Sequence, residues 1–236
     1  MRNFLILASS ILFPILSKAQ FKAGQIFFQG GFNLSLSDSK YLSTYGDSQF
    51  GNYSHDISYS SGYFTDQNRA IGWTLNQSLS LAKIQYSGNT NDPAPTLQSI
   101  GFGGGRFVEH YKSLSDKFAL YVRPGFNLSY TLQNQDDQQN GNAFTRTQTN
   151  TFTLGADVSA GVAWLLSPKW ALYGGFAFAN PISISAGWRN TESTTQNSGR
   201  PTNRKGSFFN YNLSPNLSSG SISLGFRYLV TRSTTY

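Results

Sequence analysis

The sequence predicts an all-β fold: a single antiparallel up-and-down β-barrel of about eight strands with an apolar outside. Three observations lead to this prediction. Alternation between apolar and polar residues recurs roughly eight times after residue 20. The segments between these stretches are long and short in turn. Charged residues make up only 12% of the chain, whereas aromatic residues make up 15%.

Composition indicates that the barrel spans a membrane. A water-soluble barrel covers its outside with Lys, Glu, Asp and Arg. Here the polar faces of the strands are mostly Ser, Thr, Asn, Gln and Gly, which suit the inside of a transmembrane β-barrel whose outside contacts lipid. The formal net charge of +7 is spread thinly along the chain, so no nucleic-acid partner is expected.

The first 19 residues have the features of a secretory signal peptide. Arg2 gives a positive start, an apolar run covers residues 4–16, and Ser17-Lys18-Ala19 forms a small-x-small cleavage site. The run is too short for a membrane-spanning helix, which needs about 20 apolar residues. The chain has no cysteine, so we expect no disulfide, thiolate metal site or lipid-modified cysteine. Residues 20–236 then form one barrel domain.

Eight alternating segments are expected to be strands. They cover residues 25–36, 53–64, 70–86, 100–111, 118–132, 149–165, 170–182 and 221–230. The fourth segment changes parity, because Phe102 and Phe107 cannot share a face without an extra residue between them. A bulge at Gly103, Gly104 and Gly105 would reconcile its two halves.

Long polar segments and short turns alternate between the expected strands. The long segments are residues 38–52, 87–95, 134–148 and 189–217, and the short ones are 65–69, 112–117 and 166–169. This asymmetry is typical of barrels with long loops outside the cell and short turns in the periplasm. Large aromatic residues lie close to the short turns, as an interfacial girdle requires: Trp73, Phe118, Trp164, Trp170 and Tyr228.

The last strand carries a family resemblance. Ile222, Leu224, Phe226 and Tyr228 alternate with small or polar residues. Ser223, Gly225 and Tyr228 fit the closing-strand pattern of bacterial outer-membrane barrels, although Val230 stands where a second aromatic residue is usual. The chain therefore resembles small outer-membrane β-barrels of the adhesion and OmpA-like type. This resemblance implies a monomer in the Gram-negative outer membrane, handled by the barrel assembly machinery through its last strand.

Residues with catalytic potential are few, and no cofactor or metal is expected. The glycine-rich segment 101–105 precedes alternating strand residues rather than a helix, so it is not a phosphate-binding loop. His55 adjoins Ser54 and Asp56, the residue types of a hydrolytic triad, but neighbours in a strand point to opposite faces. His110 lies near the inner end of its strand. We expect a non-enzymatic protein.

Four charged residues are expected inside the barrel as an ion network: Arg106, Arg123, Asp157 and Arg227. An eight-stranded barrel is only wide enough for its own side chains, so these charges are expected to pair and plug the lumen. Asp157 is predicted to pair with Arg123. The bulge would turn Arg106 inward and Phe107 toward lipid, where an exposed Arg is costly.

The last long segment is basic. It holds Arg189, Arg200, Arg204 and Lys205 against Glu192, which suits the phosphates of lipopolysaccharide. The alternative is that a long polar segment needs some charge for solubility. Three functions remain open: loops that contact the envelope or other surfaces, a narrow channel for small or hydrophobic molecules, and a lipid-modifying enzyme.

Overall fold

The computed structural model describes residues 21–41, 47–87, 96–139, 143–194, 201–213, 217–218 and 223–231. The predicted signal peptide lies outside these residues, as do Arg200 and most of the expected loop at 87–95. Within the described part of the chain, no helix is long and apolar enough to cross a membrane.

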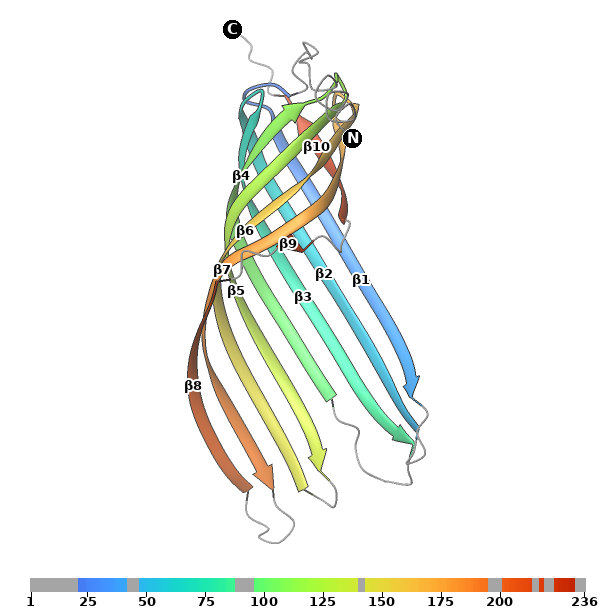
Figure 1. Ribbon diagram of the computed structural model, residues 1–236, viewed down its shortest axis with the longest axis vertical. Coiled ribbons are helices and arrows are strands. Elements are labelled where there is room, and N and C mark those ends of the chain that lie inside the picture. Colours follow the sequence, from blue (N-terminus) through green and yellow to red (C-terminus); the bar gives the residue numbers. More distant parts are fainter. Residues whose placement is uncertain are drawn as a thin grey trace, which may run out of the picture.

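The described chain forms one antiparallel sheet that curls into a ring (Figure 1). Its strands are β1 (Ile26–Tyr41), β2 (Asp47–Asp66), β3 (Arg69–Ser87), β4 (Thr96–Ser113), β5 (Phe118–Gln139), β6 (Ala143–Ser167), β7 (Trp170–Thr194), β8 (Pro201–Leu213), β9 (Leu217–Ser218) and β10 (Ser223–Val230). Strands β1 to β7 pair in chain order, and β10 pairs with both β1 and β7. The predicted up-and-down barrel is confirmed, with eight positions in its ring.

Three segments share the eighth position. Strand β10 pairs with β7 between Trp170 and Gly175, β9 pairs with Phe178 and Ala179, and β8 pairs with β7 from Ile182 onward. On its other edge, β10 pairs with residues 26–30 of β1. The ring is therefore closed at the end that holds the short turns, which we call the turn end.

At the opposite end, which we call the loop end, the described strands show no pairing that closes the ring. Within the described part of the chain, residues 31–37 of β1 pair only with β2, and β8 pairs only with β7. In Figure 1, β1 and β8 run along the two outer edges of the lower half of the sheet.

The outside of the barrel is apolar, because each strand turns its large apolar residues outward. Phe32, Leu75, Leu128 and Leu154 all have more than half of their surface exposed. Such an exterior suits the hydrocarbon core of a bilayer. Near the turns, the Phe118 and Trp164 rings stack at 5.4 Å, and Trp170 contacts Tyr228 at 5.0 Å. These aromatic pairs have the positions expected of an interfacial girdle, and Phe118, Trp164 and Trp170 are exposed.

Three of the expected long loops are wrong in extent: residues 38–52, 134–148 and 189–217. The strands instead remain paired through most of these segments, in the hairpins β1–β2, β5–β6 and β7–β8. Alternation marks a strand only where one face meets lipid and the other does not. Beyond the membrane both faces meet water, so the backbone pairs while the sequence shows no period of two.

The bulge expected in β4 is absent. The register of β4 with both neighbours continues without a shift through Gly103, Gly104 and Gly105. Phe102 therefore points outward and Phe107 inward, and Phe107 is 2% exposed. The bulge would be needed only if Phe102 and Phe107 both faced lipid. Phe107 instead packs inside the lumen, so the strand needs no extra residue.

Two glycines make room for the aromatic rings inside the turn end. Gly62 and Gly72 lie opposite each other on β2 and β3. A Cβ atom on Gly62 would lie 2.6 Å from the Phe27 ring, and one on Gly72 would lie 2.6 Å from the Phe107 ring. The same Cβ atoms would also lie 2.3 Å from the Ile71 carbonyl oxygen and 2.5 Å from that of Ser61, so both positions exclude a side chain unless the paired backbone moves as well as the rings.

Replacing Gly62 with Ala is expected to lower the free energy of unfolding by about 1–3 kcal/mol, because both the Phe27 ring and the Ile71 backbone must shift in a filled interior. Gly206→Ala is the matched control, since a Cβ there meets no atom within 4 Å. Urea unfolding in lipid vesicles, monitored by heat-modifiable gel migration, gives the urea midpoint of each variant. Equal midpoints for the two variants would contradict the packing role.

Candidate functional site

The centre of the candidate site is Arg227 on β10. Alternation along β10 turns Leu224 and Phe226 outward and sends Gly225, Arg227 and Leu229 into the lumen. The Arg227 side chain has no exposed surface. A guanidinium group in such a place requires a counter-charge and partners for its donors.

Glu109 on β4 supplies that charge. Arg227 donates from Nη1 to Oε2 of Glu109 at 2.7 Å and from Nη2 to Oε1 at 2.8 Å, a bidentate pair. Gln29 Oε1 accepts from Nε at 3.1 Å and from Nη2 at 2.6 Å. The hydroxyl oxygens of Tyr111 and Tyr173 accept from Nη1 at 2.7 and 3.1 Å. Tyr111 in turn donates to Glu109.

Aromatic rings cover the charged groups. The Arg227 guanidinium carbon lies 3.9 Å from the centre of the Phe27 ring and 3.8 Å from that of Tyr173. Arg123 lies over the Phe107 ring at 3.5 Å, and its Nη1 is 3.9 Å from Glu109 Oε1. Cation–π contacts of this kind strengthen when they are shielded from water.

The N-terminal segment seals this cluster from the turn end. Phe21 is 1% exposed, stacks on Phe64 with ring centres 4.4 Å apart, and contacts Tyr111 at 4.9 Å. We call the whole group the plug: Phe21, Phe27, Phe64, Phe107, Glu109, Tyr111, Arg123, Tyr173 and Arg227. It fills the lumen at the turn end with buried side chains.

Between the plug and the loop end, the inner wall changes character. Many of the residues that point inward there are small or polar, including Gly101, Gly103 and Gly155. Asn33, Asp56 and Asn76 also point inward and are nevertheless exposed. We call this part of the lumen the outer compartment.

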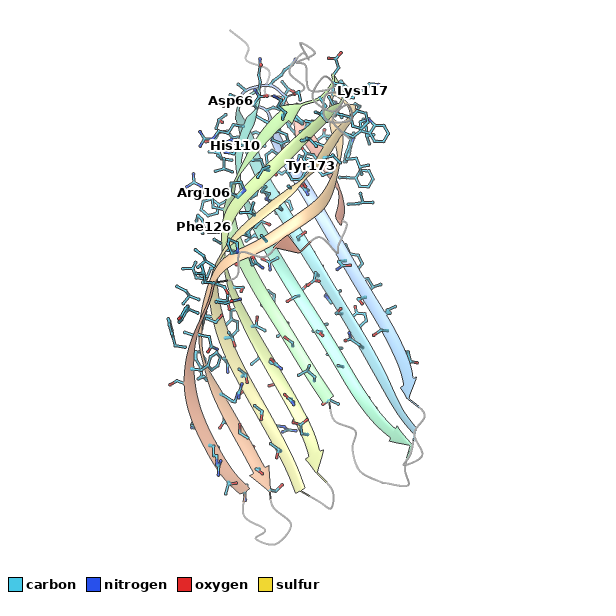
Figure 2. The ribbon with its side chains drawn as sticks, in the orientation of Figure 1. Asp66, Arg106, His110, Lys117, Phe126 and Tyr173 are labelled. Atoms are coloured by element: carbon cyan, nitrogen blue, oxygen red, sulfur yellow. The ribbon has the colours of Figure 1, made fainter. Side chains whose placement is uncertain are left out.

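The structure agrees with only part of the expected ion network. Arg123 and Arg227 lie inside, but the prediction for Arg106 is wrong. Arg106 is exposed, lies opposite the outward residues Trp73 and Phe126, and its guanidinium is 5.4 Å from the Trp73 ring centre. Figure 2 shows Arg106 and Phe126 on the outside of the wall. A long Arg side chain near the turn end reaches the interface by snorkelling.

The predicted partner of Asp157 is also wrong. Its Oδ1 accepts a hydrogen bond from Asn127 at 3.1 Å, and Arg123 is paired with Glu109 instead. Sequence reasoning missed Glu109 because Phe107 was assigned to the lipid face, which placed Glu109 there as well. Unbroken alternation along β4 would have put Phe107, Glu109 and Tyr111 together inside.

Among the described residues, His55 is not grouped with its neighbour Asp56. His55 points outward, where its Nδ1 lies 2.9 Å from the Tyr53 hydroxyl and its Nε2 lies 3.4 Å from Gln77 Nε2. Asp56 points inward, as the alternation of β2 requires. Among the described residues, no cluster of His, Cys, Asp or Glu has the arrangement of a metal site.

The basic residues near the loop end divide between two faces. Arg189 points inward and donates from Nε to Thr149 Oγ1 at 3.4 Å. Arg204 lies opposite Thr191, which also faces inward and contacts Thr147. Lys205 lies opposite Asn190 on the outer face, beside the exposed Trp188. Arg200 lies outside the described residues.

Glu109→Gln is expected to lower the free energy of unfolding by about 3–5 kcal/mol, because it leaves Arg227 buried without a counter-charge. Removing both charges, in Glu109→Gln with Arg227→Met, is expected to recover part of the loss. Asp136→Asn is the control: it breaks the 2.9 Å pair with Arg146, which is largely exposed and contributes under about 1 kcal/mol. The urea midpoints of these variants in lipid vesicles measure their losses of stability. A Glu109→Gln midpoint within error of the control would show that the pair does not stabilise the barrel.

Neither a protein-family model nor a curated protein sequence matches the chain. The solved structures with a similar arrangement of strands include two outer membrane proteins. The outer membrane protein OprG from Pseudomonas aeruginosa is 11% identical, with a TM-score of 0.47, covering 91% of this chain and 100% of that one. A major outer membrane protein from Thermus thermophilus is 10% identical, with a TM-score of 0.45, covering 87% and 99%. Both similarities concern the arrangement of strands alone.

Proposed function

We propose that the protein is a non-enzymatic outer-membrane barrel that acts at the cell surface. Its turn end is a solid anchor that faces the periplasm, and its loop end carries the contacts with the envelope or with other surfaces. The apolar exterior and the aromatic girdle support the location.

The observation that carries this proposal is the plug. Arg227 and Glu109 have no exposed side-chain surface, and Phe21 closes the turn end beneath them. A solute that entered the loop end would have to displace this hydrogen-bonded cluster to reach the periplasm. The geometry therefore favours surface interaction over an axial channel.

The length of the strands supports the same proposal. A membrane-spanning strand needs about 9–11 residues. Strands β6 and β7 have 25 residues each, and β5 has 22. The excess extends beyond the apolar belt at the loop end as paired, polar β-hairpins. Ordered hairpins of this kind offer a fixed surface for contacts with lipopolysaccharide.

Assembly and oligomeric state belong to the same proposal. The barrel assembly machinery would recognise the outward face of β10, which is formed by Leu224, Phe226 and Tyr228. At the turn end, the eight positions of the ring are all filled from one chain, which supports a monomer.

The wild-type protein is expected to show no steady ion conductance in planar lipid bilayers, because the plug blocks the axis. A variant with Ala at Glu109, Tyr111 and Arg227 is expected to conduct, provided that heat-modifiable gel migration shows it folded. Stepwise conductance by the folded wild-type protein would favour the narrow channel instead. If the triple variant does not fold, the wild-type recording remains decisive.

Lys205→Glu is expected to weaken binding to purified lipopolysaccharide several-fold at low salt, because exposed charges attract over the ~10 Å Debye length of 0.1 M salt. The difference is expected to vanish near 1 M salt. Lys117→Glu, at an exposed site on the turn end, is the matched control. Surface plasmon resonance on immobilised lipopolysaccharide measures both, and equal binding at low salt would reject the outer face of β7–β8 as the contact.

A further inference from the structure

A cavity lies toward the loop end, where β6, β7 and β8 run side by side (Figure 1). Its volume is about 510 Å³, which is within the range of about 300–1,000 Å³ that small-ligand sites have. Most of the side chains that line it belong to the outer face of these strands: Gln148, Trp188, Asn190, Lys205 and Ser207. We call it the hairpin cavity.

The strand registers place the hairpin cavity between an apolar and a charged part of the outer face. Toward the turn end, one row across the three strands consists of Phe152, Ala186 and Phe209. Toward the loop end, another row consists of Arg146, Glu192 and Asn203. The two rows between them carry the outward residues of the cavity. The cavity therefore lies at the edge of the apolar belt, where the protein surface becomes polar.

Trp188 gives the cavity an aromatic surface. The side chain is 50% exposed. Its ring contacts that of Phe152, on the side of the apolar belt, with ring centres 6.0 Å apart and planes tilted by 42°. The face of an aromatic ring carries partial negative charge. Trp188 therefore offers a flat surface to C–H groups, which carry partial positive charge.

Asn190 gives the cavity an acceptor that lacks a donor. The residue is half-buried, and its Oδ1 is covered yet accepts no hydrogen bond within the described part of the chain. In the next row, by contrast, Asn150 Oδ1 accepts from the Tyr130 hydroxyl at 2.5 Å. Covered acceptors without a donor are rare in folded proteins. Gln148 and Lys205 flank Asn190 and are long and exposed, so a ligand hydroxyl can reach Oδ1 when they move.

These groups match a sugar ring better than an acyl chain or a phosphate. A pyranose has a face of C–H groups and a rim of hydroxyls that donate and accept, as amide side chains do. An acyl chain would cover Gln148, Asn190 and Lys205 without offering them partners. A phosphate is best bound by guanidinium groups, but Arg189, which also lines the cavity, directs its Nε to Thr149.

We infer that the hairpin cavity is a binding site for one pyranose unit of a glycan. The sugar ring stacks on Trp188, and its hydroxyls form hydrogen bonds with Gln148, Asn190 and Lys205. The inference rests on the proposed role at the cell surface and deepens it, because it names the sugar ring, rather than a phosphate, as the group that is recognised. Lipopolysaccharide and the glycans of other surfaces present this same chemistry.

Saturation-transfer difference NMR of the full-length protein in phosphatidylcholine nanodiscs tests the inference. The probes are the methyl pyranosides of glucose, galactose, mannose and N-acetylglucosamine, and dephosphorylated core oligosaccharide from lipopolysaccharide. At least one probe is expected to bind saturably at millimolar concentration, and equally well at low salt and at ~1 M salt, because these probes carry no phosphate for exposed charges to attract. Tightest binding by the core oligosaccharide would identify lipopolysaccharide as the source, and tightest binding by a methyl pyranoside would identify a glycan of another surface.

Substitutions in the cavity give the matched comparison. Trp188→Leu is expected to raise the half-saturating concentration at least tenfold, and Asn190→Ala several-fold, whereas Trp188→Phe is expected to keep part of the affinity because it keeps a ring. Trp170→Leu, at an exposed Trp of the turn end, and Asn203→Ala, on the same face of β8 outside the cavity lining, are expected to change nothing. Heat-modifiable gel migration checks that each variant is folded. If Trp188→Leu does not fold, Asn190→Ala and Asn203→Ala remain the decisive pair.

Three results would each overturn the inference. The first is no saturable binding of any probe, and the second is equal half-saturation in the cavity variants and their controls. The third is binding of glucose 1-phosphate, but of no neutral probe, that disappears near ~1 M salt. This third result would leave the attraction of Lys205 for lipopolysaccharide intact. Steady conductance by the wild-type protein, in contrast, would contradict the role of the plug without altering the sugar measurements.

Discussion

The neutralisation of Arg227 is the constraint on which the rest of the structure depends. A guanidinium group inside a narrow barrel is tolerated only with a counter-charge and a full set of acceptors. Glu109 comes from β4, on the far side of the ring from β10, and Gln29, Tyr111 and Tyr173 complete the set. The pair therefore braces the barrel across its diameter. It also fixes the register of β1, β4, β7 and β10 relative to one another.

The two halves of the interior differ because their side chains differ in size. At the turn end, Phe, Tyr and Arg fill the lumen, and glycines such as Gly62 and Gly72 make room for the rings. Toward the loop end, many of the inward residues are small, such as Gly101, Gly103 and Gly155. The described barrel therefore has a packed, cross-braced segment at the turn end and small inward residues beyond it.

The fold could be predicted from the sequence, but the composition of the site could not. Alternation, turn lengths and the closing strand indicate the barrel, because a lipid-facing wall imposes a period of two. The same rule fails at Phe107, since an aromatic residue serves equally well in lipid and in a filled lumen. Because the prediction placed Phe107 toward lipid, it also placed Arg106 inside the barrel and did not identify Glu109 as a lumen residue. Residues 38–52 resemble a loop because a paired strand with water on both faces leaves no periodic signal.

The polar hairpins beyond the apolar belt have a consequence for how the sequence can change over time. Their strands pair from Gln133↔Thr149 to Gln139↔Ala143 in β5–β6 and from Arg189↔Gly206 to Thr194↔Pro201 in β7–β8, and this pairing does not depend on which polar side chain is attached. Substitutions among Ser, Thr, Asn and Gln therefore alter the surface while the ladder keeps its register. The part of the protein that meets the environment is free to diversify on a constant frame, whereas the braced interior is not.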